Sequence, residues 1–405
     1  MSATELHGPF VLLGVVFLLG LATDVLGRHT VLPRASLLLL MGIAIGPSAL
    51  GWIETTENGW SYFVANLALV MVGFLLGGSL SAQALREHGR AILWLSIGKA
   101  VGAFAVVSGG LLVVGAGVET ALLLGAVATS TAPAATADVV RSDRAEGPFT
   151  RQLLGIVAVD DAWGLIVFGL ALATVHAMAG AGANGAIALA AWDLGGAVLL
   201  GLVLGVPAAL LTGRVESGEP TQAEALGIVC LCAGLALRFE VSFLLAAMVM
   251  GATVANLARH HNRPFHAIEG IEWPFMILFF TLAGASLDLG ASAGTLGLVP
   301  AYILLRAVGT ITGTMLGSLA AAERPLSAAA SSTSYWMGLS LMPQAGVALG
   351  MALVATQQVP SLGAVVLPVV ILSTACSEIV GPILTRRALE HVGEAGNVEV
   401  APPGD

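Results

Sequence analysis

Long apolar segments follow one another along almost the whole chain, and they constrain its fold more than any other feature. The thirteen segments span about residues 8–27, 31–50, 60–79, 91–116, 119–140, 152–175, 186–213, 222–237, 241–258, 268–287, 295–320, 332–356 and 363–385. About 20 apolar residues in a helix cross a bilayer, and a helix pairs its own backbone groups in lipid. Only 10% of the 405 residues are charged, against about 25% in soluble domains. The sequence therefore predicts an all-α polytopic membrane protein with thirteen transmembrane helices.

The arginines in the loops indicate how these helices are oriented, because cytoplasmic loops are enriched in basic residues. Thirteen arginines fall on one predicted side and one, Arg238, on the other. The thirteen are Arg28, Arg34, Arg86, Arg90, Arg141, Arg144, Arg151, Arg214, Arg259, Arg263, Arg324, Arg386 and Arg387, and the opposite loops hold Glu54, Glu57, Glu119, Asp193 and Asp288. We predict an outside N-terminus and a cytoplasmic C-terminus in a bacterial inner membrane. Residues 391–405 form a short cytoplasmic tail, and disorder is expected after Arg387.

Two adjacent aspartates, Asp160 and Asp161, are the only charged residues between Gln152 and Val175. Charge inside a membrane is costly and usually functional. Asp160 lies about 12 Å along the helix from Gln152, near the middle of a hydrocarbon core about 30 Å thick. Neighbouring residues on a helix point about 100° apart. We therefore predict that Asp161 faces a bound ion while Asp160 turns toward a neighbouring helix.

The only two basic residues inside predicted helices begin matching stretches, which indicates an internal repeat. Residues 99–102 (KAVG) match 306–309 (RAVG), and 77–80 (GGSL) match 284–287 (GASL), both at an offset of 207 residues. Lys99, the sole lysine, lies on a helix that runs outward, whereas Arg306 lies on one that runs inward. Repeats of inverted topology are typical of secondary transporters.

Each repeat is followed by an apolar segment that is polar and interrupted by proline. These segments contain 129–136 (TSTAPAAT) and 338–346 (GLSLMPQAG). Interrupted helices at equivalent positions of two repeats indicate an ion site near the membrane midplane. The hypothesis is that Na⁺ or K⁺ binds the carboxylates and is displaced by protons that compete for the same site. The predicted site residues are Asp161, Asp160 and Thr131, with backbone groups at Ala132, Pro133, Pro343 and Gln344.

These features resemble the monovalent cation:proton antiporters of the sodium/hydrogen exchanger superfamily, in particular the bacterial Kef/Nap-type branch. The Asp160-Asp161 pair is the most specific element, and 32–47, 130–133, 243–254 and 279–288 also match. The resemblance implies an Nha/Nap-like antiporter fold, a homodimer, and a core that slides like an elevator against a dimer domain. It aligns Asp161 with the shared cation and proton carrier, Asp160 with the second aspartate of the electrogenic branch, and Arg306 with a basic residue facing the pair.

The resemblance also implies the division of the chain. Residues 1–390 form one transmembrane unit, with the core at about 91–175 and 295–385 and the dimer scaffold at about 31–79 and 186–287. No cofactor, enzymatic activity or nucleic acid is expected; the partners are the monovalent cation, protons and membrane lipid. The chain departs from relatives at Ile156, Ala132 and Gln344, where they carry glutamate, aspartate and arginine.

Several alternatives stay open at this point. Asp160 could instead form a structural salt bridge with Lys99 or Arg306, both of which are interpreted as charge-balancing. Arg306 does not titrate at accessible pH, so Lys99 is the alternative carrier of a second proton. An organic-anion symporter on the same fold or a cation channel are the competing functions. The sequence does not choose between Na⁺ and K⁺, and the roles of Lys99 and Glu378 stay open.

Overall fold

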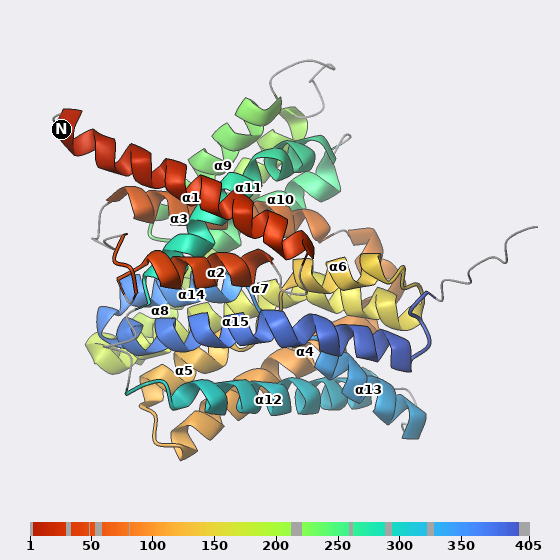
Figure 1. Ribbon diagram of the computed structural model, residues 1–405. Coiled ribbons are helices and arrows are strands. Elements are labelled where there is room, and N and C mark those ends of the chain that lie inside the picture. The colour runs from red at the N-terminus through yellow and green to blue at the C-terminus, as the bar shows by residue number, and fades with distance from the viewer. Residues whose placement is uncertain are drawn as a thin grey trace, which may run out of the picture.

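The computed structural model describes residues 3–29, 34–47, 49–52, 59–80, 82–211, 221–258, 262–287, 294–321 and 328–396. Within them all regular structure is helical (Figure 1). The helices are α1 (Ala3–His29), α2 (Arg34–Ile45), α3 (Gly59–Ser79), α4 (Ala82–Val113), α5 (Val118–Val127), α6 (Pro133–Ser142), α7 (Pro148–His176), the π-helical η1 (Ala177–Ala181), α8 (Gly182–Leu211), α9 (Thr221–Arg238), α10 (Phe243–Leu257), α11 (Asn262–Ala285), α12 (Leu298–Ala321), α13 (Ala328–Ser340), α14 (Gly346–Gln358) and α15 (Pro360–His391). Leu32, Pro33, Glu54, Glu57, Arg214, Arg259, Asp288 and Arg324 lie outside the described residues.

The described residues form fifteen α-helices, where the sequence predicted thirteen helical segments. Two segments account for the difference, because 119–140 is divided into α5 and α6, and 332–356 into α13 and α14. The chain leaves the helical conformation at 128–132, called the first break below, and at 341–345, called the second break. Pro133 is the first residue of α6, a position where its missing N–H costs nothing.

Several helices have the length and composition of membrane spans. Five described stretches, at 89–113, 148–179, 187–211, 298–321 and 360–391, are long and apolar enough to cross a bilayer. Others are apolar but shorter, such as Val118–Val127 and Phe243–Leu257. Large apolar side chains are exposed on the outer surface, among them Leu18, Leu199 and Leu304. An apolar exterior of this kind suits lipid rather than water.

Helices α4 and α12 pack together directly along their backbones (Figure 1). A Cβ atom added to Gly102 of α4 would lie 2.4 Å from the Cα of Gly313 of α12. A Cβ on Gly98 would lie 2.6 Å from the carbonyl oxygen of Gly313. Glycine contacts of this kind let membrane helices approach closely. The contact brings together the two helices that carry Lys99 and Arg306.

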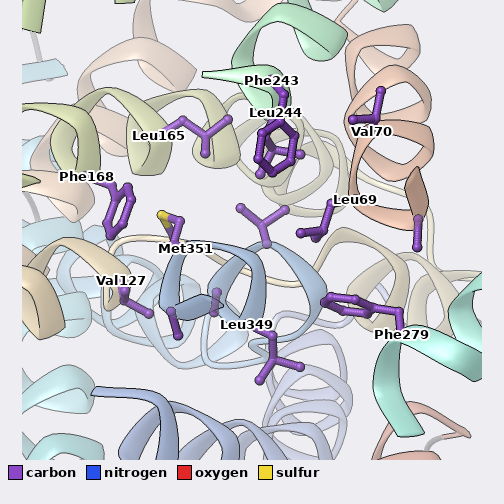
Figure 2. Packing of buried hydrophobic residues seen from close by; sticks show 14 of the residues in the cluster. Leu69, Val70, Val127, Leu165, Phe168, Phe243, Leu244, Phe279, Leu349 and Met351 are labelled. Carbon is purple, nitrogen blue, oxygen red and sulfur yellow. The ribbon is translucent and has the colours of Figure 1, made fainter. Parts of the chain in front are cut away.

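Two hydrophobic clusters lie along α7, one toward each end of the helix. The larger includes Leu165 and Phe168 of α7 with Met351 of α14, which point toward one another in Figure 2. The smaller includes Leu153 and Ile156 of α7, together with residues of α4, α6, α13 and α15. The part of α7 between the two clusters carries the adjacent aspartates.

The segment after α15 lies against the loop that precedes α7. The carboxylate of Glu394 accepts hydrogen bonds from the backbone N–H groups of Phe149 (2.9 Å) and Thr150 (2.8 Å), so it caps the free N–H groups at the start of α7. The guanidinium of Arg386 donates to Asp143, and this bond lowers the pKa of Asp143 below its usual value. The prediction of disorder after Arg387 was therefore wrong for the described residues. Glu394 binds the N–H groups of Phe149 and Thr150, which are distant in sequence, so no local pattern reveals this contact.

Candidate functional site

Asp160 and Asp161 lie in the middle of α7, completely surrounded by protein. Asp160 is 0% exposed and Asp161 1% exposed. Helix α7 packs against α4, α5 and α6, so the first break and the helix of Lys99 both lie beside it. The structure thus brings the predicted carboxylates next to one of the predicted broken segments.

Lys99 is the basic side chain that contacts Asp160. Its ammonium group forms a buried ion pair with Asp160 Oδ2, donates to the backbone carbonyl of Thr129, and lies 2.8 Å from the hydroxyl oxygen of Thr131. An ammonium group has three hydrogens, and these three oxygens account for all of them. Of the two basic partners that the sequence left open for Asp160, the structure places Lys99 against it.

Arg306 instead joins the two breaks to each other. Its guanidinium donates to the carbonyls of Ala128 (3.2 Å) and Ser130 (2.9 Å) in the first break. It also donates to those of Met342 (2.6 Å) and Pro343 (3.5 Å) in the second. All four hydrogen bonds of Arg306 to described residues therefore go to backbone carbonyls that a regular helix would have paired internally. The planar fork of a guanidinium suits such a divided task.

The two breaks also bind each other directly. The N–H of Ala132 donates to the carbonyl of Pro343 (2.9 Å), and the hydroxyl of Thr131 lies 3.2 Å from the carbonyl of Leu341. The amide of Gln344 donates to the carbonyl of Val127 (3.0 Å). The predicted residues Thr131, Ala132, Pro343 and Gln344 are thus in one place, with Pro133 directly following as the start of α6.

Tyr302 belongs to the same network, and the sequence analysis did not identify it. It is fully buried on α12, one turn before Arg306, and its hydroxyl lies 3.2 Å from the side-chain nitrogen of Gln344. The sequence did contain a signal for it, because a tyrosine lies one turn before Arg306 in an apolar segment. A buried tyrosine hydroxyl usually has a hydrogen-bond partner, so such a contact could have been predicted.

Asp161 differs from its neighbour because nothing in the described part of the protein binds it. Neither of its carboxylate oxygens accepts a hydrogen bond, and neither does Oδ1 of Asp160 or Oε1 of Gln344. A buried polar group without a partner costs about 1–3 kcal/mol, and more when it is charged. The Asp161 carboxylate therefore needs a proton or a cation to be stable where it lies.

A cavity of about 470 Å³ lies between α7, α14 and the helices α8, α9 and α10. Its apolar wall includes Leu165, one turn beyond Asp161 on α7, and polar groups line it at His176, Asp193 and Glu240. The cavity therefore follows the α7 face on which Asp161 lies. Asp161 itself is not among the residues that line the cavity.

Comparison with known proteins identifies the family of the chain. The family model for "sodium/hydrogen exchanger, transmembrane" matches residues 13–391. The ammonium/H⁺ antiporter subunit AmhT of Alkalihalophilus pseudofirmus (strain ATCC BAA-2126 / JCM 17055 / OF4) is 24% identical over 309 residues, which are 76% of this chain and 77% of the relative.

Solved structures show the same fold. The sodium proton antiporter MjNhaP1 from Methanocaldococcus jannaschii at pH 8 matches with a TM-score of 0.72 and 18% identity, over 97% of this chain and 100% of that chain. A structure of MjNhaP1 from electron microscopy gives a TM-score of 0.75 and 16% identity, over 98% and 100%. The predicted all-helical, multi-pass membrane protein is confirmed. The chain belongs to the family of transmembrane sodium/hydrogen exchangers, whose members are transporters that exchange cations and protons.

Proposed function

We propose that this protein exchanges a monovalent cation for protons, and that Asp161 is the group for which the two compete. The observation that carries the proposal is the buried Asp161 carboxylate, which has no hydrogen-bond donor in the described residues, while its neighbour Asp160 is paired with Lys99. One uncompensated negative charge can be neutralised by a cation or by a proton but not by both at once. Competition for one charge is the simplest form of antiport.

The surrounding oxygens supply the other ligands of the cation in this proposal. Thr131 and the carbonyl groups of the two breaks lie where the breaks contact each other, a place called the crossing below, and Oε1 of Gln344 has no partner. Arg306 holds four of the break carbonyls, so it positions the breaks rather than binding the ion. We assign a second proton to Lys99, because an ammonium can release a proton when a cation draws Asp160 away, and a guanidinium cannot.

The movement that we propose is an elevator-type displacement of a core against a scaffold. The core comprises α4–α7 and α12–α15, the scaffold α2, α3 and α8–α11, and the cavity lies at the boundary between them. Counting α5 with α6 and α13 with α14 gives thirteen membrane crossings. The inverted repeat belongs to this proposal and is supported by the matching stretches at an offset of 207 residues, and the cytoplasmic C-terminus is supported by the distribution of arginines. The homodimer, the Kef/Nap-type branch and the bacterial inner membrane rest on the family resemblance.

Two other functions fit the site less well. An organic-anion symporter needs free cationic donors for its substrate, whereas the ammonium of Lys99 and the guanidinium of Arg306 are engaged by protein oxygens. A cation channel needs rings of repeated carbonyls or carboxylates, whereas the described residues hold one asymmetric pair. Exchange at Asp161 needs neither feature.

Proton flux in proteoliposomes with a pH-sensitive dye tests the proposal. Na⁺, K⁺ and NH₄⁺ are added in turn, the last because the relative AmhT is named an ammonium/H⁺ antiporter subunit. We expect one cation to drive proton movement, and we expect Asp161→Asn to abolish it. Glu146→Gln, on an exposed loop, is the control that should exchange normally, and protein-free liposomes correct for passive NH₃ entry. Wild-type flux in Asp161→Asn would refute the role of Asp161.

A further inference from the structure

A third buried carboxylate, Glu378, lies on α15 and is not part of the site described above. It is the only acidic residue of α15 before Glu390, and it is 3% exposed. Its Oε1 accepts no hydrogen bond from the described residues. Unlike Asp160, it forms no ion pair with a basic side chain among the described residues. A carboxylate left unpaired inside a membrane protein is costly, which marks it as a functional group.

The face of α15 that carries Glu378 packs against the second break. Thr374, Glu378, Gly381 and Thr385 follow at intervals of four, three and four residues, so they share one face of the helix. A Cβ added to Gly381 would lie 2.7 Å from Cγ of Pro343, and the hydroxyl of Thr385 donates to the carbonyl of Ser340 (3.1 Å). Glu378 therefore lies one helical turn from a direct contact with the crossing.

Helix α6 also packs against α15, and its Asp138 is close enough to Glu378 to interact with it electrostatically. Asp138 is exposed while Glu378 is buried. Other charged groups on helices that pack against α15 are Arg34 of α2, Glu119 of α5, Arg141 of α6 and Arg306 of α12. Arg306 is occupied by carbonyls. The exposed carboxylate of Asp138 and the buried carboxylate of Glu378 thus lie between the surface of the protein and the second break.

We propose that Glu378 is a proton relay residue between the exposed Asp138 and the crossing of the two breaks. A proton from solvent binds the carboxylate of Asp138, moves to that of Glu378, and passes on to the carboxylate of Asp161, whose oxygens have no donor in the described residues. Asp138 and Glu378 each end as they began. A relay suits Glu378 better than a cation site, because a cation needs several oxygen ligands, and on this face of α15 the described residues add only the unpartnered hydroxyl of Thr374. The inference rests on the proposed exchange at Asp161 and adds the route of its protons.

The test separates proton movement from cation movement. Proteoliposomes with wild type, Glu378→Gln and the matched control Glu390→Gln, at the exposed end of the same helix, are assayed in two ways. The first is cation-driven proton flux, and the second is exchange of radioactive Na⁺, or of Rb⁺ as a tracer for K⁺, between equal concentrations on both sides. We expect Glu378→Gln to slow the proton flux by about tenfold or more, the scale of losing a positioned proton-transfer group, while tracer exchange stays within about twofold of wild type.

Three results would overturn the inference. If both rates fall together, Glu378 supports the structure rather than the proton route. If neither changes, it has no part in transport. Wild type without any cation-driven proton flux would refute the proposed function itself, and the relay with it. Partial recovery of the proton flux in Glu378→Asp would support the relay, because aspartate keeps the carboxyl group and shortens its reach.

Discussion

At the scale of single residues, Lys99 and Arg306 divide two tasks that the sequence could not assign. Both are fully buried on helices that pack together. The ammonium of Lys99 lies against a carboxylate, whereas the guanidinium of Arg306 reaches carbonyls of both breaks. A compact charge suits the first task and a planar fork the second. Exchanging the two residue types would therefore leave both sets of partners incompletely bound.

The pairing of Lys99 with Asp160 predicts a large coupling between them. Removing one partner of a buried ion pair costs about 3–5 kcal/mol, because the other charge is left without compensation. We expect Lys99→Met to lower the free energy of unfolding in detergent by this amount. The double variant Lys99→Met/Asp160→Asn should recover much of the loss. Additive effects of the two single variants, measured in a double-mutant cycle, would contradict the pairing.

Much of the residue list could be predicted from the sequence, because charge and proline are conspicuous in apolar segments. Asp160, Asp161, Thr131 and the residues around both prolines were predicted together, and the structure brings them together. The basic partner of Asp160 was not predictable, because side-chain reach decides it and spacing along the chain does not reveal reach. Tyr302 was missed for the same reason, since its contact with Gln344 crosses 42 residues.

At the scale of elements, the close contact of α4 with α12 depends on the glycines of α4 that lie directly against α12. Gly102 has backbone atoms of Gly309 and Gly313 within 3 Å of an added Cβ, whereas Gly109 of the same helix has nothing within 4 Å. Backbone atoms cannot rotate away as a side chain can. Replacing each glycine by alanine therefore tests the same change on one helix, once at a tightly packed position and once at an open position.

We predict effects of opposite sign for alanine at these two positions. Gly102→Ala should force α4 and α12 apart, lower the unfolding temperature in detergent and slow exchange. Gly109→Ala should raise the unfolding temperature, because alanine is favoured over glycine in a helix by about 1 kcal/mol. Equal effects of the two variants would show that the close contact does not limit stability.

The elements show where prediction from sequence ends. Both interruptions were foreseen, since proline disrupts a helix. Their bounds differ, however, because Pro133 starts α6 and Pro343 lies within the second break. The prediction of thirteen helical segments gave too few helices, because each interrupted segment folds as two. The order of the segment after Arg387 depends on a contact between distant parts of the chain, which no local pattern contains.

At the scale of the whole molecule, the cavity separates helices of the proposed core from those of the proposed scaffold. Leu237 of α9 and Gln358 of α14 both line it, one from each group. If the core slides, their separation must change during each cycle. A covalent bridge across the cavity would then hold the protein in one state.

A cross-linking experiment measures this movement. Leu237→Cys and Gln358→Cys are introduced together after replacing the native Cys230, Cys232 and Cys376, and a cleavable bifunctional maleimide is added. We expect the bridged protein to stop exchanging cations for protons and to resume when the linker is cleaved. Each single-cysteine variant, treated in the same way, should remain active. Full activity of the bridged protein would rule out a sliding core.

The Glu394 cap has a consequence for the order in which the protein is made. Glu394 follows Phe149, the residue that it caps, by 245 positions. During translation α7 must therefore enter the membrane, with its two aspartates, long before its N-terminal N–H groups gain this partner. Lys99 is synthesised earlier, so the charge of Asp160 can be matched at once. The partner in the ion pair is thus translated before α7, and the capping residue long after it. The N-terminus of α7 gains its Glu394 cap only when nearly all the described residues have been translated.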